Sequence, residues 1–182
     1  MTKKDIIKKT SKLFEEFGLK IATMDRISSH LGVSKKTLYK HFSNKEDIIN
    51  YYLKYSYTSL IKEIESKFDL NPIEYLVFID NLIVDKILAI SPIVLEDIKK
   101  YYIDSEKIWK RNRAMFIMRF AKLLDEGKNK KLFISKINSK LLAELRLIEI
   151  ELIWKRDGIR KVNVQKSEQT QLFDHFMRGI LI

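Results

Sequence analysis

The sequence contains no cysteine, and its 182 residues include only three histidines. Without cysteine, a disulfide framework, a thiolate nucleophile and a cysteine-based metal site are all excluded, and the composition suits a reducing cytoplasm. His30, His41 and His175 are scattered without a metal-ligand spacing, and no glycine-rich phosphate loop or nucleophile motif occurs. We therefore expect no metal and no cofactor, and we do not expect an enzyme.

Long apolar runs are also missing. The longest, from Tyr75 to Val84, is interrupted by Asp80 and Asn81 and is too short to span a bilayer. The stretch MTKKDIIKKT is charged and lacks the apolar segment of a signal peptide. With 46% apolar and 32% charged residues, the composition is that of a folded protein. We expect a cytoplasmic protein that has no membrane partner.

Acidic residues are outnumbered, since 35 Lys and Arg face 24 Asp and Glu and give a formal charge of +11. Residues 1–50 hold eleven of the basic and six of the acidic residues, so the excess is denser at the N-terminus. An anionic partner is expected there. Charge alone does not separate DNA from a membrane surface, but the basic residues do not line one long amphipathic helix, which disfavours a membrane.

The stretch from Thr23 to Lys45, TMDRISSHLGVSKKTLYKHFSNK, predicts two short helices joined by a tight turn. Gly32 can take the positive φ that such a turn needs, and Ser34 can cap the next helix. Ser28 is small enough to sit where the two helices cross. Apolar residues four apart on both sides of the turn would pack together: Ile27, Leu31, Leu38 and Phe42. This is the pattern of a helix-turn-helix, whose second helix enters the DNA major groove.

The outward surface of the second helix is polar and basic. Lys36 and Lys40 point away from Leu38, and Thr37 and Tyr39 occupy the flanks. Ammonium and phenol groups suit phosphates, whereas Lys and Thr side chains can also contact base edges. On spacing alone, a solvated helical hairpin with ordinary surface lysines remains an alternative.

The run LGVSKKTLYKHFSNKEDII resembles the DNA-binding signature of the TetR family of bacterial transcriptional regulators. The similar features are the Gly-Val-Ser turn, the Thr-Leu-Tyr core of the recognition helix, the His-Phe that ends it and the following Asn-Lys-Glu. Upstream, Phe17-Gly18 and the Thr23 cap also fit, so the resemblance covers about the first 50 residues. Ser28 departs from the pattern, because the family more often has Ala there.

The resemblance implies DNA contacts for individual residues. It implies phosphate contacts for Tyr39, His41 and Lys45, and base contacts for Lys35, Lys36 and Thr37. From the residues themselves, the Thr23 hydroxyl is expected beside a phosphate at a helix start, and Lys40 belongs to the same outward surface.

The remaining pattern predicts an all-α protein of about nine helices. We expect a three-helix helix-turn-helix DNA-binding domain over residues 1–47 and a helical effector-binding and dimerisation domain over residues 48–182. A capping box between Ser43 and Glu46 should open the fourth helix. The expected helices span residues 3–17, 24–31, 35–42, 45–68, 72–89, 92–101, 105–127, 139–157 and 167–182.

The last two expected helices carry more apolar surface than one core needs. A second subunit could cover the surplus in a four-helix bundle, which is how TetR-like proteins dimerise. A core internal to one chain remains the alternative. The expected homodimer interface comprises Leu141, Leu145, Ile148, Leu152, Leu172, Phe173, Phe176, Met177 and Ile180.

The family places a small-molecule pocket between the helices expected at 72–89 and 105–127. Arg119 could pair there with an anionic ligand, or with Asp80 or Asp85. The apolar residues could equally be core residues without a ligand. The candidate ligand-binding residues are Tyr75, Phe78, Ile79, Trp109, Met115, Phe116 and Arg119.

The resemblance and the patterning together predict a dimeric repressor that binds a near-palindromic double-stranded DNA operator. A small apolar or amphipathic effector is expected to release it. The alternative is a DNA-binding protein of the same fold without an inducer, acting in chromosome organisation or through protein partners. The sequence specifies neither the operator nor the effector, and it does not separate a repressor from an activator.

Overall fold

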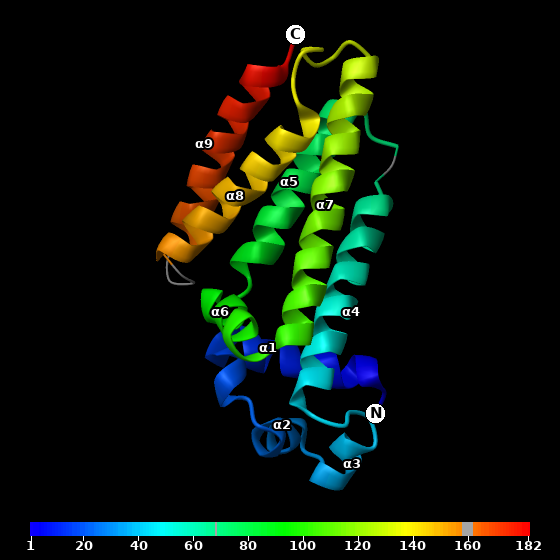
Figure 1. Ribbon diagram of the computed structural model, residues 1–182, viewed down its shortest axis with the longest axis vertical. Coiled ribbons are helices and arrows are strands. Elements are labelled where there is room, and N and C mark those ends of the chain that lie inside the picture. Colours follow the sequence, from blue (N-terminus) through cyan, green and yellow to red (C-terminus); the bar gives the residue numbers. More distant parts are fainter. Residues whose placement is uncertain (68, 158–161) are drawn as a thin grey trace. The chain divides into compact units, whose positions relative to one another are not determined.

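The computed structural model describes residues 1–67, 69–157 and 162–182 of the chain (Figure 1). These ranges contain nine helices and no β-structure except one bridge between Phe133 and Leu181, which confirms the all-α prediction. None of the described helices is long and apolar enough to cross a membrane. The helices are α1 (Lys3–Ile21), α2 (Met24–Leu31), α3 (Lys35–Tyr39), α4 (Lys45–Glu65), α5 (Pro72–Leu88), α6 (Pro92–Tyr101), α7 (Ile103–Asn129), α8 (Ser139–Asp157) and α9 (Val162–Ile180).

The chain divides into two compact units. Unit 1 comprises residues 1–62 and 90–112, and unit 2 comprises residues 63–89 and 113–182. Helices α4 and α7 therefore contribute residues to both units. Unit 1 includes α6 in addition to the N-terminal helices, so it is larger than the DNA-binding domain that we predicted for residues 1–47. The division into a DNA-binding domain before residue 48 and an effector-binding and dimerisation domain after it stays a prediction.

The core of unit 1 is built from the apolar residues that the spacing identified. Ile27 and Leu38 are fully buried, and Leu31 and Phe42 are nearly so. Ser28 is also buried, and its hydroxyl donates to the Asp25 carbonyl at 2.9 Å. Helix α2 packs against both α1 and α3, so a single apolar cluster holds the helical hairpin in place.

Two local details of unit 1 differ from the prediction. Helix α3 ends at Tyr39, because the N–H of His41 bonds to the Leu38 carbonyl at 3.0 Å in a turn that returns Phe42 to the core. The cap of α4 is shifted by one residue from the predicted Ser43–Glu46 box. Asn44 Oδ1 accepts from the Asp47 N–H at 2.9 Å, because α4 begins at Lys45 and the residue before it takes the capping position.

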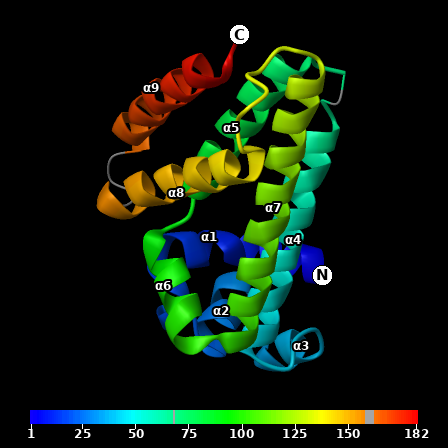
Figure 2. The ribbon, with the colours of Figure 1, turned by 45° about the horizontal axis from the view of Figure 1, so that its top comes forward.

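Unit 2 is organised around a contact between three helices. Helix α5 packs against α8 and α9, which also pack against each other (Figure 2). Helix α9 begins at Val162, five residues earlier than predicted. Helix α7 continues through Gly127 to Asn129, two residues beyond the predicted end. The Phe133 ring lies where a side chain at position 127 would be, with Phe133 Cδ2 2.1 Å from that Cβ position, so glycine is needed there for packing and not to end the helix.

A buried ion pair joins α5 and α8. Arg146 Nε and Nη2 donate to the two carboxylate oxygens of Asp80 at 2.7 and 2.9 Å. Arg146 Nη2 also donates to the Gln169 carbonyl of α9 at 3.2 Å, and Nη1 donates to Glu149 at 3.2 Å. Burial raises the pKa of the Asp80 carboxyl, and the hydrogen bonds from Arg146 oppose this shift. The guanidinium thus connects α5, α8 and α9.

Candidate nucleic-acid interface

The turn between α2 and α3 has the conformation that the sequence predicts. Gly32 adopts φ +65°, ψ +32°, in the left-handed region that favours glycine. The Val33 N–H closes the turn on the Ser28 carbonyl at 3.0 Å. Ser34 Oγ then accepts from the Thr37 N–H at 3.1 Å and caps α3. These bonds fix the direction in which α3 leaves the turn.

The outward surface of α3 presents cations and a phenol to solvent. Tyr39 is 51% exposed, and Lys36 and Lys40 are exposed as well. Neither lysine forms an ion pair with any described residue. Thr37 is half-buried and its hydroxyl lies 2.9 Å from Ser34 Oγ, so the threonine is tied to the start of the helix. The surface therefore offers unpaired positive charge that phosphates can neutralise.

Lys35 differs from its neighbours on α3 because it is paired. Its ammonium forms an ion pair with Asp25 of α2, and both side chains are more than half exposed. Exposed pairs of this kind contribute about 0–1 kcal/mol. A DNA phosphate or base could therefore displace Asp25 at little cost, although Lys35 is less available than Lys36.

A second set of predicted contacts lies at the starts of α2 and α4. Thr23 is exposed, and its hydroxyl oxygen accepts from the Arg26 N–H at 3.2 Å as the α2 cap. Lys45 is half-buried, and its Nζ donates to the Lys20 carbonyl at 3.3 Å. It also lies 5.5 Å from the centre of the Tyr102 ring. Burial lowers the pKa of the Lys45 ammonium, and the negative charge of Asp97 opposes this shift.

All eight residues predicted to contact DNA thus lie in unit 1, between the start of α2 and the start of α4. His41 is half-buried in the turn after α3. Sequence reasoning missed the support from α6, whose Asp97 accepts from the Lys20 N–H at 2.8 Å. No local pattern connects residues 77 positions apart. Direct DNA contact by each of the eight residues stays a prediction.

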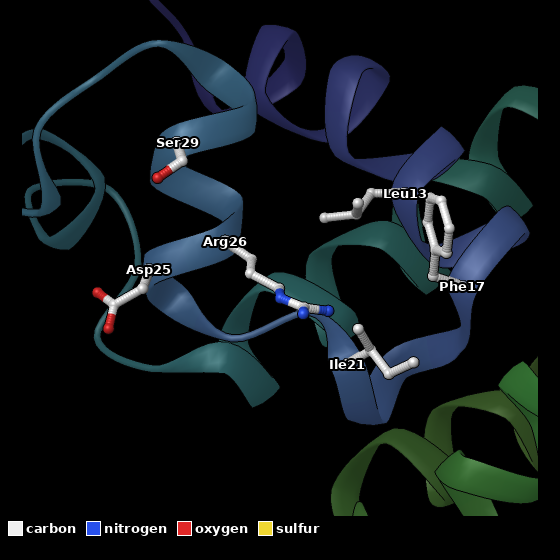
Figure 3. A pocket seen from close by; sticks show the side chains of 6 residues that line it. All are labelled: Leu13, Phe17, Ile21, Asp25, Arg26 and Ser29. Atoms are coloured by element: carbon white, nitrogen blue, oxygen red, sulfur yellow. The ribbon is translucent and has the colours of Figure 1, made fainter.

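A shallow groove of about 380 Å³ lies between α1 and α2 in unit 1 (Figure 3). In the close-up, the Arg26 side chain extends across the groove toward Leu13 and Ile21. Phe17 and Ile21 are partly exposed there although they are apolar. The complete lining is Leu13, Phe17, Ile21, Asp25, Arg26 and Ser29.

The predicted dimer residues fall into two groups. On α8, Leu141, Leu145, Ile148 and Leu152 are between 42% and 62% exposed. On α9, by contrast, Phe173, Met177 and Ile180 are buried in the core of unit 2, and Leu172 and Phe176 are half-buried. Periodicity identified the apolar face of α9, but that face packs mainly within its own chain. Among the predicted interface residues, the exposed ones therefore belong to α8.

The predicted ligand-binding residues are divided between the two units, and only Tyr75 and Phe78 are seen to stack, with ring centres 6.5 Å apart. Trp109 belongs to unit 1 and packs against its core, whereas the other six belong to unit 2. Within unit 2, Ile79 and Phe116 are buried, Tyr75 and Phe78 are half-buried, and Met115 is exposed. Arg119 is exposed and pairs with Glu65 at 3.4 Å, whereas Asp80 pairs with Arg146 and Asp85 pairs with Lys166.

The N-terminal sequence matches a family of known regulators. Residues 6–52 match the family described as "Bacterial regulatory proteins, tetR family". An uncharacterised HTH-type transcriptional regulator, YhgD of Bacillus subtilis, is 37% identical over 67 residues, which are 37% of this chain and 33% of that protein. An HTH-type transcriptional regulator of Staphylococcus aureus (strain USA300) is 45% identical over 40 residues, 22% of each chain. The matches thus span a third or less of these relatives' lengths.

Solved structures extend the similarity in fold to nearly the whole chain. The regulatory protein TetR from Rhodobacter sphaeroides has a TM-score of 0.81 at 16% identity and covers 98% of both chains. FadR from Bacillus subtilis, solved in complex with stearoyl-CoA, has a TM-score of 0.80 at 15% identity, covering 97% of this chain and 98% of its own. The sequence relatives are named as regulators and not as enzymes, in agreement with the prediction that this chain is not an enzyme. Residues 6–52 thus match the tetR family in sequence, and nearly the whole chain is similar in fold to solved TetR-type regulators.

Proposed function

We propose that the protein is a transcriptional repressor that binds a near-palindromic operator as a homodimer and is released by a small apolar or amphipathic ligand. The observation that supports this most directly is the outward surface of α3. A capped helix after a left-handed glycine turn presents Lys36, Tyr39 and Lys40 to solvent without acidic partners among the described residues. Such a helix fits the major groove, and its lysines would release counterions from phosphates.

The exposed stripe on α8 supports the dimer. Leu141, Leu145, Ile148 and Leu152 recur three or four residues apart, so they share one face of the helix. A contiguous exposed apolar stripe typically marks an interface. Paired with a second copy across a two-fold axis, α8 and α9 of each chain would form a four-helix bundle. The two recognition helices would then meet half-sites about one DNA turn, 34–36 Å, apart.

The proposed ligand would bind in unit 2. This unit contains a chain of contacting phenyl rings from α7 and α9, in which Phe120 lies 6.0 Å from Phe116 and 6.2 Å from Phe176, and Phe173 stacks on Phe176 at 5.8 Å. Aromatic surroundings suit an apolar ligand, and one protein of similar fold was solved in complex with stearoyl-CoA. A ligand that favours a dimer with differently spaced recognition helices would lower operator affinity.

The DNA-binding part is tested with an operator selected from a random DNA pool. Lys45→Ala should weaken binding to every sequence and should reduce the slope of log K against log salt by about one phosphate contact. Thr37→Ala should change the preferred base at one position of each half-site. Lys54→Ala, which changes an exposed lysine further along α4, is the control and should bind like the parent. If Lys45→Ala and Thr37→Ala both bind like the parent, the assignment of α3 is wrong.

Sedimentation tests the dimer. The parent should have the mass of a dimer at micromolar concentration, and Leu145→Glu/Leu152→Glu should be monomeric because four carboxylates would meet in the interface. Ile103→Glu, which changes an exposed apolar residue of unit 1, should leave the mass unchanged. A monomeric parent would contradict the proposal.

Titration with stearoyl-CoA, with coenzyme A as the control, tests the ligand. We expect stearoyl-CoA to raise the melting temperature and to lower operator affinity, since a ligand stabilises the state that it binds. If stearoyl-CoA has neither effect and no molecule is retained by the purified protein, the result favours the alternative hypothesis, a DNA-binding protein of the same fold that has no inducer. Such a protein would act in chromosome organisation or through protein partners.

A further inference from the structure

Helix α1 is interrupted just before the helix-turn-helix. Gly18 adopts φ +75°, ψ 173°, so residues 19–21 form a separate last turn. A Cβ at Gly18 would lie 2.4 Å from Ile93 Cγ2 of α6, so any other residue here would clash with the Ile93 side chain in addition to straining the backbone. The interruption breaks the regular hydrogen bonding of the helix, so N–H groups just after it need other acceptors.

Asp97 of α6 supplies one of these acceptors. Its Oδ2 accepts from the Lys20 N–H at 2.8 Å, although the two residues are 77 positions apart. Asp97 is only 9% exposed, so its carboxylate is largely removed from water. A hydrogen bond to an ionised and partly desolvated acceptor is stronger than one between neutral groups.

The backbone of Lys20 also binds the Lys45 side chain. The Lys20 carbonyl accepts from Lys45 Nζ at 3.3 Å, and Lys45 Nζ lies over the Tyr102 ring, which follows α6. A single peptide segment of α1 therefore connects a carboxylate of α6 to the ammonium group at the start of α4. An ammonium group has three N–H donors. Because one donor is used by the Lys20 carbonyl, two remain for a phosphate.

We propose that Asp97 is a positioning residue for DNA binding. Its hydrogen bond to Lys20 holds residues 18–23, the link between α1 and α2, in one conformation. That link in turn places Thr23 and Lys45 where they can contact phosphates. This inference rests on the proposed function. Without the Asp97 carboxylate, residues 18–23 would no longer hold Lys45 in place, so its phosphate contact would be lost together with the affinity that it contributes.

The test compares Asp97→Ala with Asp97→Asn on a selected operator, under conditions where circular dichroism finds every variant folded. Asp97→Ala removes the acceptor, so it should reduce the salt slope by about one phosphate contact and the affinity about fivefold at 0.15 M salt. Asp97→Asn keeps a side-chain oxygen that can accept from Lys20, so it should recover most of the affinity and the slope. Val94→Ala, buried on the same helix but without a bond to Lys20, should destabilise unit 1 and keep the parent's slope.

Lys45→Ala separates this inference from the proposed function. If Asp97 acts through Lys45, the double variant Asp97→Ala/Lys45→Ala should lose no more slope than Lys45→Ala alone. If Lys45→Ala lowers the slope but Asp97→Ala does not, or if Val94→Ala lowers it equally, the positioning role is overturned and the DNA contact stands. If Lys45→Ala leaves the salt slope unchanged, Lys45 does not contact a phosphate. The positioning role of Asp97 is then contradicted as well, because it acts through that contact.

Discussion

The two units differ in whether a cation is fully buried. The main core cluster of unit 1 is apolar, and the predicted DNA-contacting lysines lie outside it. Unit 2 instead buries a complete ion pair, because the side chains of Arg146 and Asp80 are only 2% and 3% exposed. The Gln165 and Gln169 side chains of α9 are buried in unit 2 as well. One unit keeps its cations available, whereas the other places one in its core.

This difference suggests different tasks for polar groups in the two units. In unit 1, charge outside an apolar core can meet an anion without losing internal contacts. In unit 2, the Arg146 guanidinium bonds to α5, α8 and α9 at once, so a shift of any one helix would leave a buried charge unpaired. A buried pair adds little net stability compared with apolar residues, but losing one partner is costly. We therefore expect the pair to fix the register of the three helices.

The exposed surfaces of the two units also differ in chemistry. Unit 1 exposes Lys36, Lys40 and Tyr39 on α3, which suit a polyanion. Unit 2 exposes Leu145 and Leu152 on α8, which suit an apolar partner surface. Each unit thus has a partner surface of its own chemistry, and substitutions in one unit should leave the partner of the other largely unaffected.

The largest effect is expected from Arg146→Ala in unit 2. It leaves the Asp80 carboxylate buried without a partner, which should reduce the free energy of unfolding by about 3–5 kcal/mol. Urea unfolding in a Trp109→Phe background reports on unit 2, because Trp154 is then the only tryptophan of the chain. Asp80→Leu/Arg146→Met should be more stable than Arg146→Ala alone. Equal losses in the two variants would show that packing, and not the unpaired charge, dominates.

Gly18→Ala should have the next largest effect, and it acts on unit 1. The positive φ combined with ψ 173° costs about 1–3 kcal/mol for a residue with a side chain, and the close approach of Ile93 adds about 1–3 kcal/mol of overpacking. Hydrogen exchange measured on peptides of α1 and α6 should show faster exchange than in the parent. Unchanged exchange in both helices would mean that the alanine is accommodated without strain, which would contradict this prediction.

Gly32→Ala should have a smaller effect because only the backbone conformation opposes it. No atom lies within 4 Å of a Cβ at Gly32, so the expected loss is about 1–2 kcal/mol from the positive φ alone. The comparison with Gly18→Ala by chemical denaturation isolates the contribution of packing against α6. If Gly32→Ala lost as much stability as Gly18→Ala, packing against α6 would contribute nothing to the effect at Gly18.

The smallest effect is expected from Lys166→Ala in unit 2. Lys166 pairs with Asp85 at 2.6 Å, but both side chains are about half exposed. Exposed pairs contribute about 0–1 kcal/mol, so the denaturation midpoint should hardly move. If this variant were as unstable as Arg146→Ala, exposure would not be what separates the two ion pairs.

The helix-turn-helix could be predicted because its determinants are local. The spacing of Ile27 and Leu31, the glycine at position 32 and the cap at Ser34 act within a few residues of one another. The cap of α4 could not be predicted to the residue, since Ser43 and Asn44 are both capping residues and only the backbone selects between them. The same holds for the end of α3, where the return of Phe42 to the core ends the helix earlier than periodicity suggests.

The sequence alone determined the helical class, the helix-turn-helix and the apolar faces of α8 and α9, because periodicity, turns and caps are properties of neighbouring residues. Only the tertiary structure decided which apolar face is covered within the chain, so that Phe173 is buried while Leu152 is exposed. It also decided that Arg146, and not Arg119, meets Asp80, and that Asp97 meets Lys20. These pairings join residues far apart in the chain, and their partners are selected by how the helices pack.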